Sequence, residues 1–153
     1  YEALDMMLGR GGNDWLQAYA ASFAKAQGNA DEDWQKHVAA RDATSKPSLA
    51  LVRYAGTYRD PWYGDVLVRQ GAKGLEMQFS KTAELLGDIE RWQHDTFIVR
   101  WRDRGLNADA FVNFTLDPDG RIREVRMEPI SPLTDFSFDF QDLRLVPVAA
   151  KKD

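Results

Sequence analysis

The sequence contains no cysteine and only two histidines among its 153 residues. The absence of cysteine excludes disulfide bonds, thiolate metal sites and cysteine nucleophiles. The two histidines, His37 and His94, are too few to form a histidine metal cluster. We therefore predict no metal site and no cofactor for this chain.

Long apolar runs and an excess of positive charge are also lacking. No run approaches the roughly 20 apolar residues that a membrane-spanning helix needs, and the first residues do not follow the pattern of a signal peptide. The 24 acidic residues outnumber the 20 basic ones, and the net charge of -4 argues against nucleic-acid binding. We expect a soluble chain without a membrane span. Because it begins with Tyr1 rather than methionine, we also expect a piece of a longer protein, in which any export signal lies upstream.

The composition changes near Lys46. Up to that residue the chain has 10 alanines and 2 residues of valine, isoleucine or threonine, whereas the remainder has 8 alanines and 17 of these β-branched residues. Alanine favours helices and β-branched residues favour strands. We therefore assign residues 1–48 to a helical segment with its linker, 49–148 to a β domain and 149–153 to a tail.

Two or three helices are expected in the first segment. Over residues 13–27, Trp15, Tyr19 and Phe23 recur at the spacing of one helix face, which predicts an amphipathic helix. The pair Gly28-Asn29 is expected to end it. The other segments predicted to be helical are residues 2–8 and 31–41.

The β domain shows a period of two. Phe97, Val99 and Trp101 alternate with more polar neighbours, as in a strand with one buried face. About eight such strands follow one another, which predicts an antiparallel up-and-down barrel, with a curled sandwich as the alternative. A shift in the apolar spacing predicts a β-bulge near Arg123 and Glu124. The predicted strands are residues 51–58, 63–69, 74–79, 85–92, 96–103, 108–116, 122–128 and 137–146.

Two short motifs resemble catalytic pairs. Ser22 and Lys25 match the Ser-x-x-Lys pattern, in which lysine activates a serine nucleophile, but the companion motifs of such hydrolases are missing. His94 and Asp95 could form a general-base pair, yet they are adjacent in an expected turn. We predict that neither pair is catalytic and that this chain alone is not an enzyme.

Aromatic side chains are the best candidates for a ligand site or an interface. Inside an eight-stranded barrel they would either fill the core or leave room for one small apolar or aromatic ligand. Both possibilities remain open at this point. The candidates are Tyr54, Tyr58, Trp62, Tyr63, Trp92, Trp101 and Phe114.

Several segments in this order resemble a known family, the lipocalin-like domain of unknown function found C-terminal to β-lactamase-related serine hydrolases. The resemblance covers roughly residues 49–146, and residues 3–15 look like the closing helix of such a hydrolase domain and the start of its connector. The matching segments are Tyr54-Ala55-Gly56-Thr57-Tyr58, Pro61-Trp62-Tyr63-Gly64, residues 74–79, Leu86-Gly87 leading to Trp92, Asp95-Thr96-Phe97 and Asp119-Gly120.

The resemblance implies a small barrel from an exported or envelope enzyme of a bacterium, with the catalytic serine in the preceding domain. Our leading hypothesis is a non-catalytic accessory module that docks on that hydrolase domain in cis. Trp15, Tyr19 and Phe23 would pack the helix against the barrel or the hydrolase domain. The alternative is a barrel that binds a small apolar or aromatic ligand. An exposed helix stripe could also make the isolated chain a homodimer.

Overall fold

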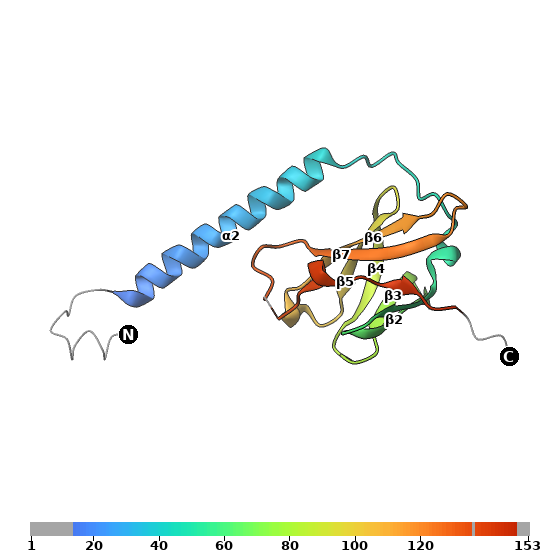
Figure 1. Ribbon diagram of the computed structural model, residues 1–153. Helices are drawn as coiled ribbons and strands as arrows, with labels where there is room; N and C mark the ends of the chain where they lie inside the picture. Colours follow the sequence, from blue (N-terminus) through green and yellow to red (C-terminus); the bar gives the residue numbers. More distant parts are fainter. Residues whose placement is uncertain (1–13, 136, 150–153) are drawn as a thin grey trace.

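The computed structural model describes residues 14–135 and 137–149 (Figure 1). One long helix, α2, precedes an eight-stranded antiparallel sheet, which confirms the predicted mainly-β fold with an N-terminal helix. The predicted helical turns at residues 2–8 lie outside the described residues. The elements are α2 (Trp15–Ala40), β1 (Gly56–Asp60), β2 (Gly64–Gly71), β3 (Gly74–Phe79), β4 (Leu86–Gln93), β5 (Thr96–Trp101), β6 (Ala110–Leu116), β7 (Ile122–Pro129) and β8 (Val146–Pro147), with short 3-10 helices at Leu51–Tyr54, Arg104–Leu106 and Phe140–Asp142.

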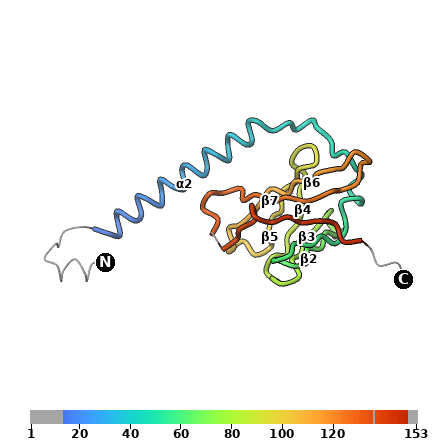
Figure 2. The backbone as a smooth tube through the Cα atoms, viewed as in Figure 1, coloured from blue at the N-terminus to red at the C-terminus, as the bar shows by residue number. Residues whose placement is uncertain are grey.

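The sheet curls into a nearly closed barrel. Strands β1 to β7 pair with their neighbours in chain order, and β8 returns to pair with β1. Immediately before β8, Leu145 exchanges two backbone hydrogen bonds with Val125 of β7, at 2.8 and 3.2 Å. Figure 2 traces this return of the C-terminal segment across the seam between β7 and β1. The barrel is thus closed by one residue pair and a two-residue strand.

The interior of the barrel is filled with apolar side chains. Tyr54, Phe97 and Phe114 meet edge to face, with ring centres 4.9 to 5.6 Å apart. Trp101, Phe79 and Phe140 form a second group of rings, in which the centre of the Trp101 ring lies 5.9 and 6.0 Å from those of Phe79 and Phe140. The buried cluster contains Tyr54, Tyr58, Val66, Val68, Leu75, Met77, Phe79, Leu85, Phe97, Val99, Trp101, Ala108, Ala110, Val112, Phe114, Val125, Met127, Phe140, Leu143 and Leu145.

The predicted β-bulge is confirmed. Thr115 pairs with Glu124 and Leu116 pairs with Ile122, which leaves Arg123 as the extra residue of β7. The bulge resets the alternation, so that Val125 and Met127 enter the core.

Three boundary predictions are wrong. The strand predicted at residues 51–58 begins as a 3-10 helix, and β1 starts only at Gly56. Gly28-Asn29 does not end a helix but lies within the 26-residue α2, which is one helix where two were expected. A glycine inside a helix costs only about 1 kcal/mol relative to alanine, and the unbroken helix brings Trp34 onto the barrel. The predicted strand 137–146 is mostly irregular and contains a 3-10 turn at Phe140–Asp142, because Phe140 and Leu143 are both buried and their spacing of three suits a helical turn.

Candidate functional site

The C-terminal half of α2 is attached to the outer face of the barrel. Ile98 of β5 and Phe111 of β6 are register partners on that face, and with Trp92 they form a second buried apolar cluster. Trp34 of α2 covers this cluster, with its ring centre 5.3 Å from that of Trp92. The outward-facing apolar residues of β4 to β6 therefore bind the protein's own helix.

Two arginines strengthen this attachment. Arg41, just after α2, donates from Nε to the backbone oxygen of Trp92 at 2.8 Å, and its guanidinium lies 4.6 Å from the Trp92 ring centre. Arg100 of β5 places its guanidinium 5.6 Å from the ring centre of Trp34. Both contacts have the geometry of a cation–π interaction. The direction in which α2 leaves the barrel is thus fixed at its last two turns.

Replacing Trp34 by alanine is expected to lower the free energy of unfolding by about 2 kcal/mol, roughly half the usual cost for a fully buried tryptophan. The ring is only partly buried, and the barrel core does not depend on it. Hydrogen exchange should accelerate in the last turns of α2 and stay unchanged in β2 and β3. Leu16→Ala, at a side chain that is 76% exposed, is the control and should change stability by less than about 0.5 kcal/mol. Equal acceleration throughout the barrel would contradict this attachment.

The N-terminal half of α2 extends beyond the barrel (Figure 1). Leu16, Tyr19 and Phe23, which we call the α2 stripe, are 76%, 77% and 59% exposed. Phe23 and Trp34 are 11 residues apart, which is close to three turns, so the stripe lies on the helix face that carries Trp34. A partner that covers the α2 stripe would therefore sit in the corner between the helix and the barrel.

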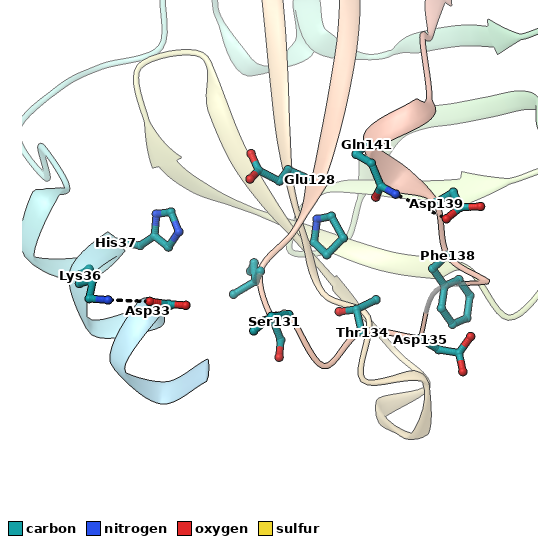
Figure 3. Close-up of a pocket in the computed structure, with 13 residues that line it drawn as sticks. Asp33, Lys36, His37, Glu128, Ser131, Thr134, Asp135, Phe138, Asp139 and Gln141 are labelled. Atoms are coloured by element: carbon teal, nitrogen blue, oxygen red, sulfur yellow. Dashed lines mark hydrogen bonds and ion pairs between the residues drawn. The ribbon is translucent and has the colours of Figure 1, made fainter. Parts of the chain in front are cut away.

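An open cleft of about 600 Å³ lies in this corner (Figure 3). Asp33, Lys36 and His37 of α2 form one wall, and residues from 128–135 and 138–141 form the other. Lys36 donates to Asp33 at 2.7 Å, and this hydrogen bond and the charge of Lys36 lower the pKa of Asp33. Acidic side chains outnumber basic ones in these walls, but apolar side chains such as Ile130 and Phe138 contribute as well. The cleft therefore offers both charged and apolar contacts to another surface.

The aromatic candidates from the sequence do not converge on one site. Tyr54, Tyr58, Trp101 and Phe114 lie inside the packed core, and Trp92 lies under α2. Trp62 is 87% exposed in the turn between β1 and β2, and Tyr63 beside it is partly buried. Of the helix candidates, Tyr19 and Phe23 belong to the α2 stripe, and Trp15 at the start of the helix is 40% exposed.

Within the part of the chain that the structure describes, no side-chain hydrogen bond joins the members of either catalytic pair considered from the sequence. Ser22 and Lys25 are exposed on α2. His94 lies in the turn between β4 and β5, while the neighbouring Asp95 carboxylate accepts hydrogen bonds from Ser48 and Tyr54. Within residues 14–135 and 137–149, no group of three or more His, Asp or Glu side chains could hold a metal ion. In the same part of the chain, no helix has the length and apolar character needed to cross a membrane.

The barrel matches a known family over residues 40–147, described as domain of unknown function DUF3471. The chain belongs to the DUF3471 family. The match begins at the last residue of α2 and ends at the last residue of β8, so nearly all of α2 lies outside the family domain. Neither the curated proteins nor the solved structures gave a significant match.

One polar cluster of the DUF3471 domain was not recognised in the sequence. The Asp95 carboxylate accepts from the Ser48 backbone N–H at 2.8 Å, the Ser48 hydroxyl at 2.7 Å and the Tyr54 hydroxyl. Burial would raise the pKa of Asp95, but these hydrogen bonds outweigh burial and hold the pKa below its usual value. Burial, together with the hydrogen bond to Asp95, raises the pKa of Tyr54 to about 12. This cluster, which we call the Asp95 clamp, fixes the linker after α2 to the barrel.

Asp60 performs a similar structural task at the turn between β1 and β2. Its Oδ1 accepts from the backbone N–H groups of Trp62 and Tyr63 at 2.8 and 3.1 Å, and its Oδ2 accepts from that of Arg144 at 2.9 Å. Burial would raise the pKa of Asp60, but the three backbone donors lower it. Asp60 therefore ties the turn of the DUF3471 domain to the segment that closes the barrel.

Proposed function

We propose that this chain is a non-catalytic accessory module that docks on a β-lactamase-related serine hydrolase domain, encoded before it in the same polypeptide of an exported bacterial enzyme. The α2 stripe carries this proposal. Three large apolar side chains on one helix face, outside the packed core, are typical of a surface that another protein domain covers. The identity of that domain is an inference from the resemblance in the sequence.

The place of α2 relative to the barrel supports this docking. Trp34, Arg41 and Arg100 hold the end of the helix against β4 to β6, so its first turns project at a defined angle. The family match leaves the helix outside, which agrees with a connector rather than an integral part of the barrel. A hydrolase domain in the corner would cover the α2 stripe and face the cleft beside the last turns of the helix.

The chemistry of the described residues supports a non-catalytic role. The exposed Ser22 and Lys25 have no companion groups around them, and Asp95 is held by structural hydrogen bonds. The positions inside the barrel that a small ligand would need are occupied by packed rings such as Trp101 and Phe114. We therefore place the reaction in the partner domain and prefer docking over an interior ligand site.

The proposal is tested on the product of the complete reading frame. We expect that frame to encode a Ser-x-x-Lys hydrolase domain before Tyr1, and hydrogen exchange over residues 15–24 to be slower in the complete protein than in this chain. Tyr19→Gln with Phe23→Gln should remove that protection. The control is Ala21→Gln with Lys25→Gln, two exposed positions on the opposite face of α2.

Three outcomes would contradict this assignment. The first is a reading frame that starts near residue 1. The second is equal exchange of residues 15–24 in the complete protein and in the isolated chain. The third is a complete protein that is dimeric only through the α2 stripe, with a mass that returns to that of the monomer in the Tyr19→Gln, Phe23→Gln variant. That result would assign the stripe to a second copy of the chain.

A further inference from the structure

The seam of the barrel is closed at only one end. Leu145 bridges to Val125 of β7, and β8 pairs with Tyr58 and Arg59 of β1. Beyond this point Val148 donates to the Thr57 oxygen at 2.8 Å, but no pairing among the described residues joins the start of β7 to β1. The seam therefore opens toward the first residues of both strands.

A groove of about 770 Å³ occupies this opening. Its volume lies within the range of small-molecule sites in proteins. Apolar side chains make up most of its walls and come from the linker, the strand β7 and the C-terminal segment, namely Leu49, Ala55, Ile122 and Val148. Unlike the barrel interior, the groove is not filled by the protein's own rings.

Two arginines, Arg53 and Arg121, also line the groove, and none of its lining residues is acidic. A groove with basic but no acidic lining residues is unusual in a chain with a net charge of -4. The side chain of Arg53 has no hydrogen bond or ion pair with any other described residue. The Arg121 side chain pairs with just one other described residue, Asp119, in an exposed contact of 3.5 Å. Both guanidinium groups are therefore available to an anion, for which their planar donor pattern is suited.

We propose that this seam groove binds a single-chain amphiphile with a carboxylate head. The alkyl chain would lie against Ile122 and Val148, and the carboxylate would pair with Arg53 and Arg121. Apolar walls with guanidinium groups and no carboxylates match such a ligand in both polarity and sign of charge. The site is separate from the α2 stripe and does not depend on the docking proposed above.

Dodecanoate, below the concentration at which it forms micelles, is the probe. Saturable changes are expected in the amide NMR signals of Thr57, Ile122 and Val148. Arg53→Gln with Arg121→Gln should weaken binding by roughly tenfold, since it removes two charge-assisted contacts. Arg123→Gln is the matched control, because this exposed arginine of β7 does not line the groove. Dodecyltrimethylammonium, with the same chain and the opposite charge, should bind at least about tenfold more weakly.

Binding by both amphiphiles with equal affinity would overturn the proposal, as would unchanged affinity in the Arg53→Gln, Arg121→Gln variant. The α2 stripe is a second apolar surface, so the Tyr19→Gln, Phe23→Gln variant is titrated in parallel. It should bind dodecanoate as the unchanged chain does. Loss of binding in that variant would place the amphiphile on the helix and reject the groove, without any consequence for docking of the hydrolase domain.

Discussion

Replacing Trp101 by alanine is expected to lower the free energy of unfolding by about 4 kcal/mol, within the range measured for buried tryptophans. The ring is 1% exposed, and it packs against Phe79 and Phe140. Its Nε1 donates to the backbone oxygen of Ala108 at 2.7 Å. Alanine would leave a cavity in the core and a buried carbonyl without its donor, and each adds to the loss. Because small domains are stable by about 5–15 kcal/mol, the variant would be close to unfolding.

Urea denaturation followed by far-ultraviolet circular dichroism measures this loss without depending on tryptophan fluorescence. Trp62→Ala is the matched control, because this ring is 87% exposed and its removal should change stability by less than about 0.5 kcal/mol. A Trp101→Ala variant as stable as the parent would show that the interior does not rely on these rings for packing. An interior ligand site would then become the better explanation of the buried aromatic residues.

The barrel could be predicted from the sequence because its strands have one buried and one polar face. In β3, Leu75, Met77 and Phe79 alternate with more exposed residues, and this period of two is visible without any knowledge of neighbouring strands. The shift of parity in β7 similarly revealed the bulge at Arg123. A pattern of this kind depends only on the two faces of the strand itself. It can therefore be read from the sequence without knowing which strands are neighbours in the sheet.

The errors occur where tertiary contacts outweigh local preference. Gly28 is a common helix-ending residue, but α2 continues through it to place Trp34 against Trp92, 58 positions further along the chain. Phe138 and Phe140 alternate as in a strand, yet the backbone turns because Leu143 must also reach the core. Neither contact can be read from the residues next to it.

The candidate site was predicted only in part. The spacing of Trp15, Tyr19 and Phe23 identified an apolar helix face, but a helical period does not tell what covers each turn of that face. In the structure the barrel contacts the end that carries Trp34, and Tyr19 and Phe23 are left exposed. The seam groove could not be anticipated, because Arg53 and Ile122 are far apart in the chain and meet only through the closure of the barrel.

The Asp95 clamp fixes the linker that orients α2 on the barrel. Asp95→Ala is expected to lower the free energy of unfolding by about 3 kcal/mol at pH 7. The Tyr54 hydroxyl and both donors of Ser48 would lose a charged acceptor, and hydrogen bonds to charged groups contribute roughly 1.5–3 kcal/mol each in favourable cases. The difference in free energy of unfolding is measured by urea denaturation of the parent chain and the variant. Hydrogen exchange of the Ser48 amide should accelerate in parallel.

The pH dependence of the stability lost in Asp95→Ala shows whether the side chain acts through its charge or only by packing. The pKa of Asp95 is lower in the folded protein than the value of about 3.9 expected in the unfolded chain. The ionised Asp95 carboxylate therefore adds its full share to the free energy of unfolding above about pH 4, and this share is lost as the pH falls through the folded pKa. The stability gap between parent and Asp95→Ala should be constant from pH 7 to about 5 and narrow only below about 4. Asp119→Ala, in an exposed turn, should show a gap below about 0.5 kcal/mol at every pH. If the Asp95→Ala gap kept its size in strong acid, the side chain would act by filling space, and the clamp would not be electrostatic.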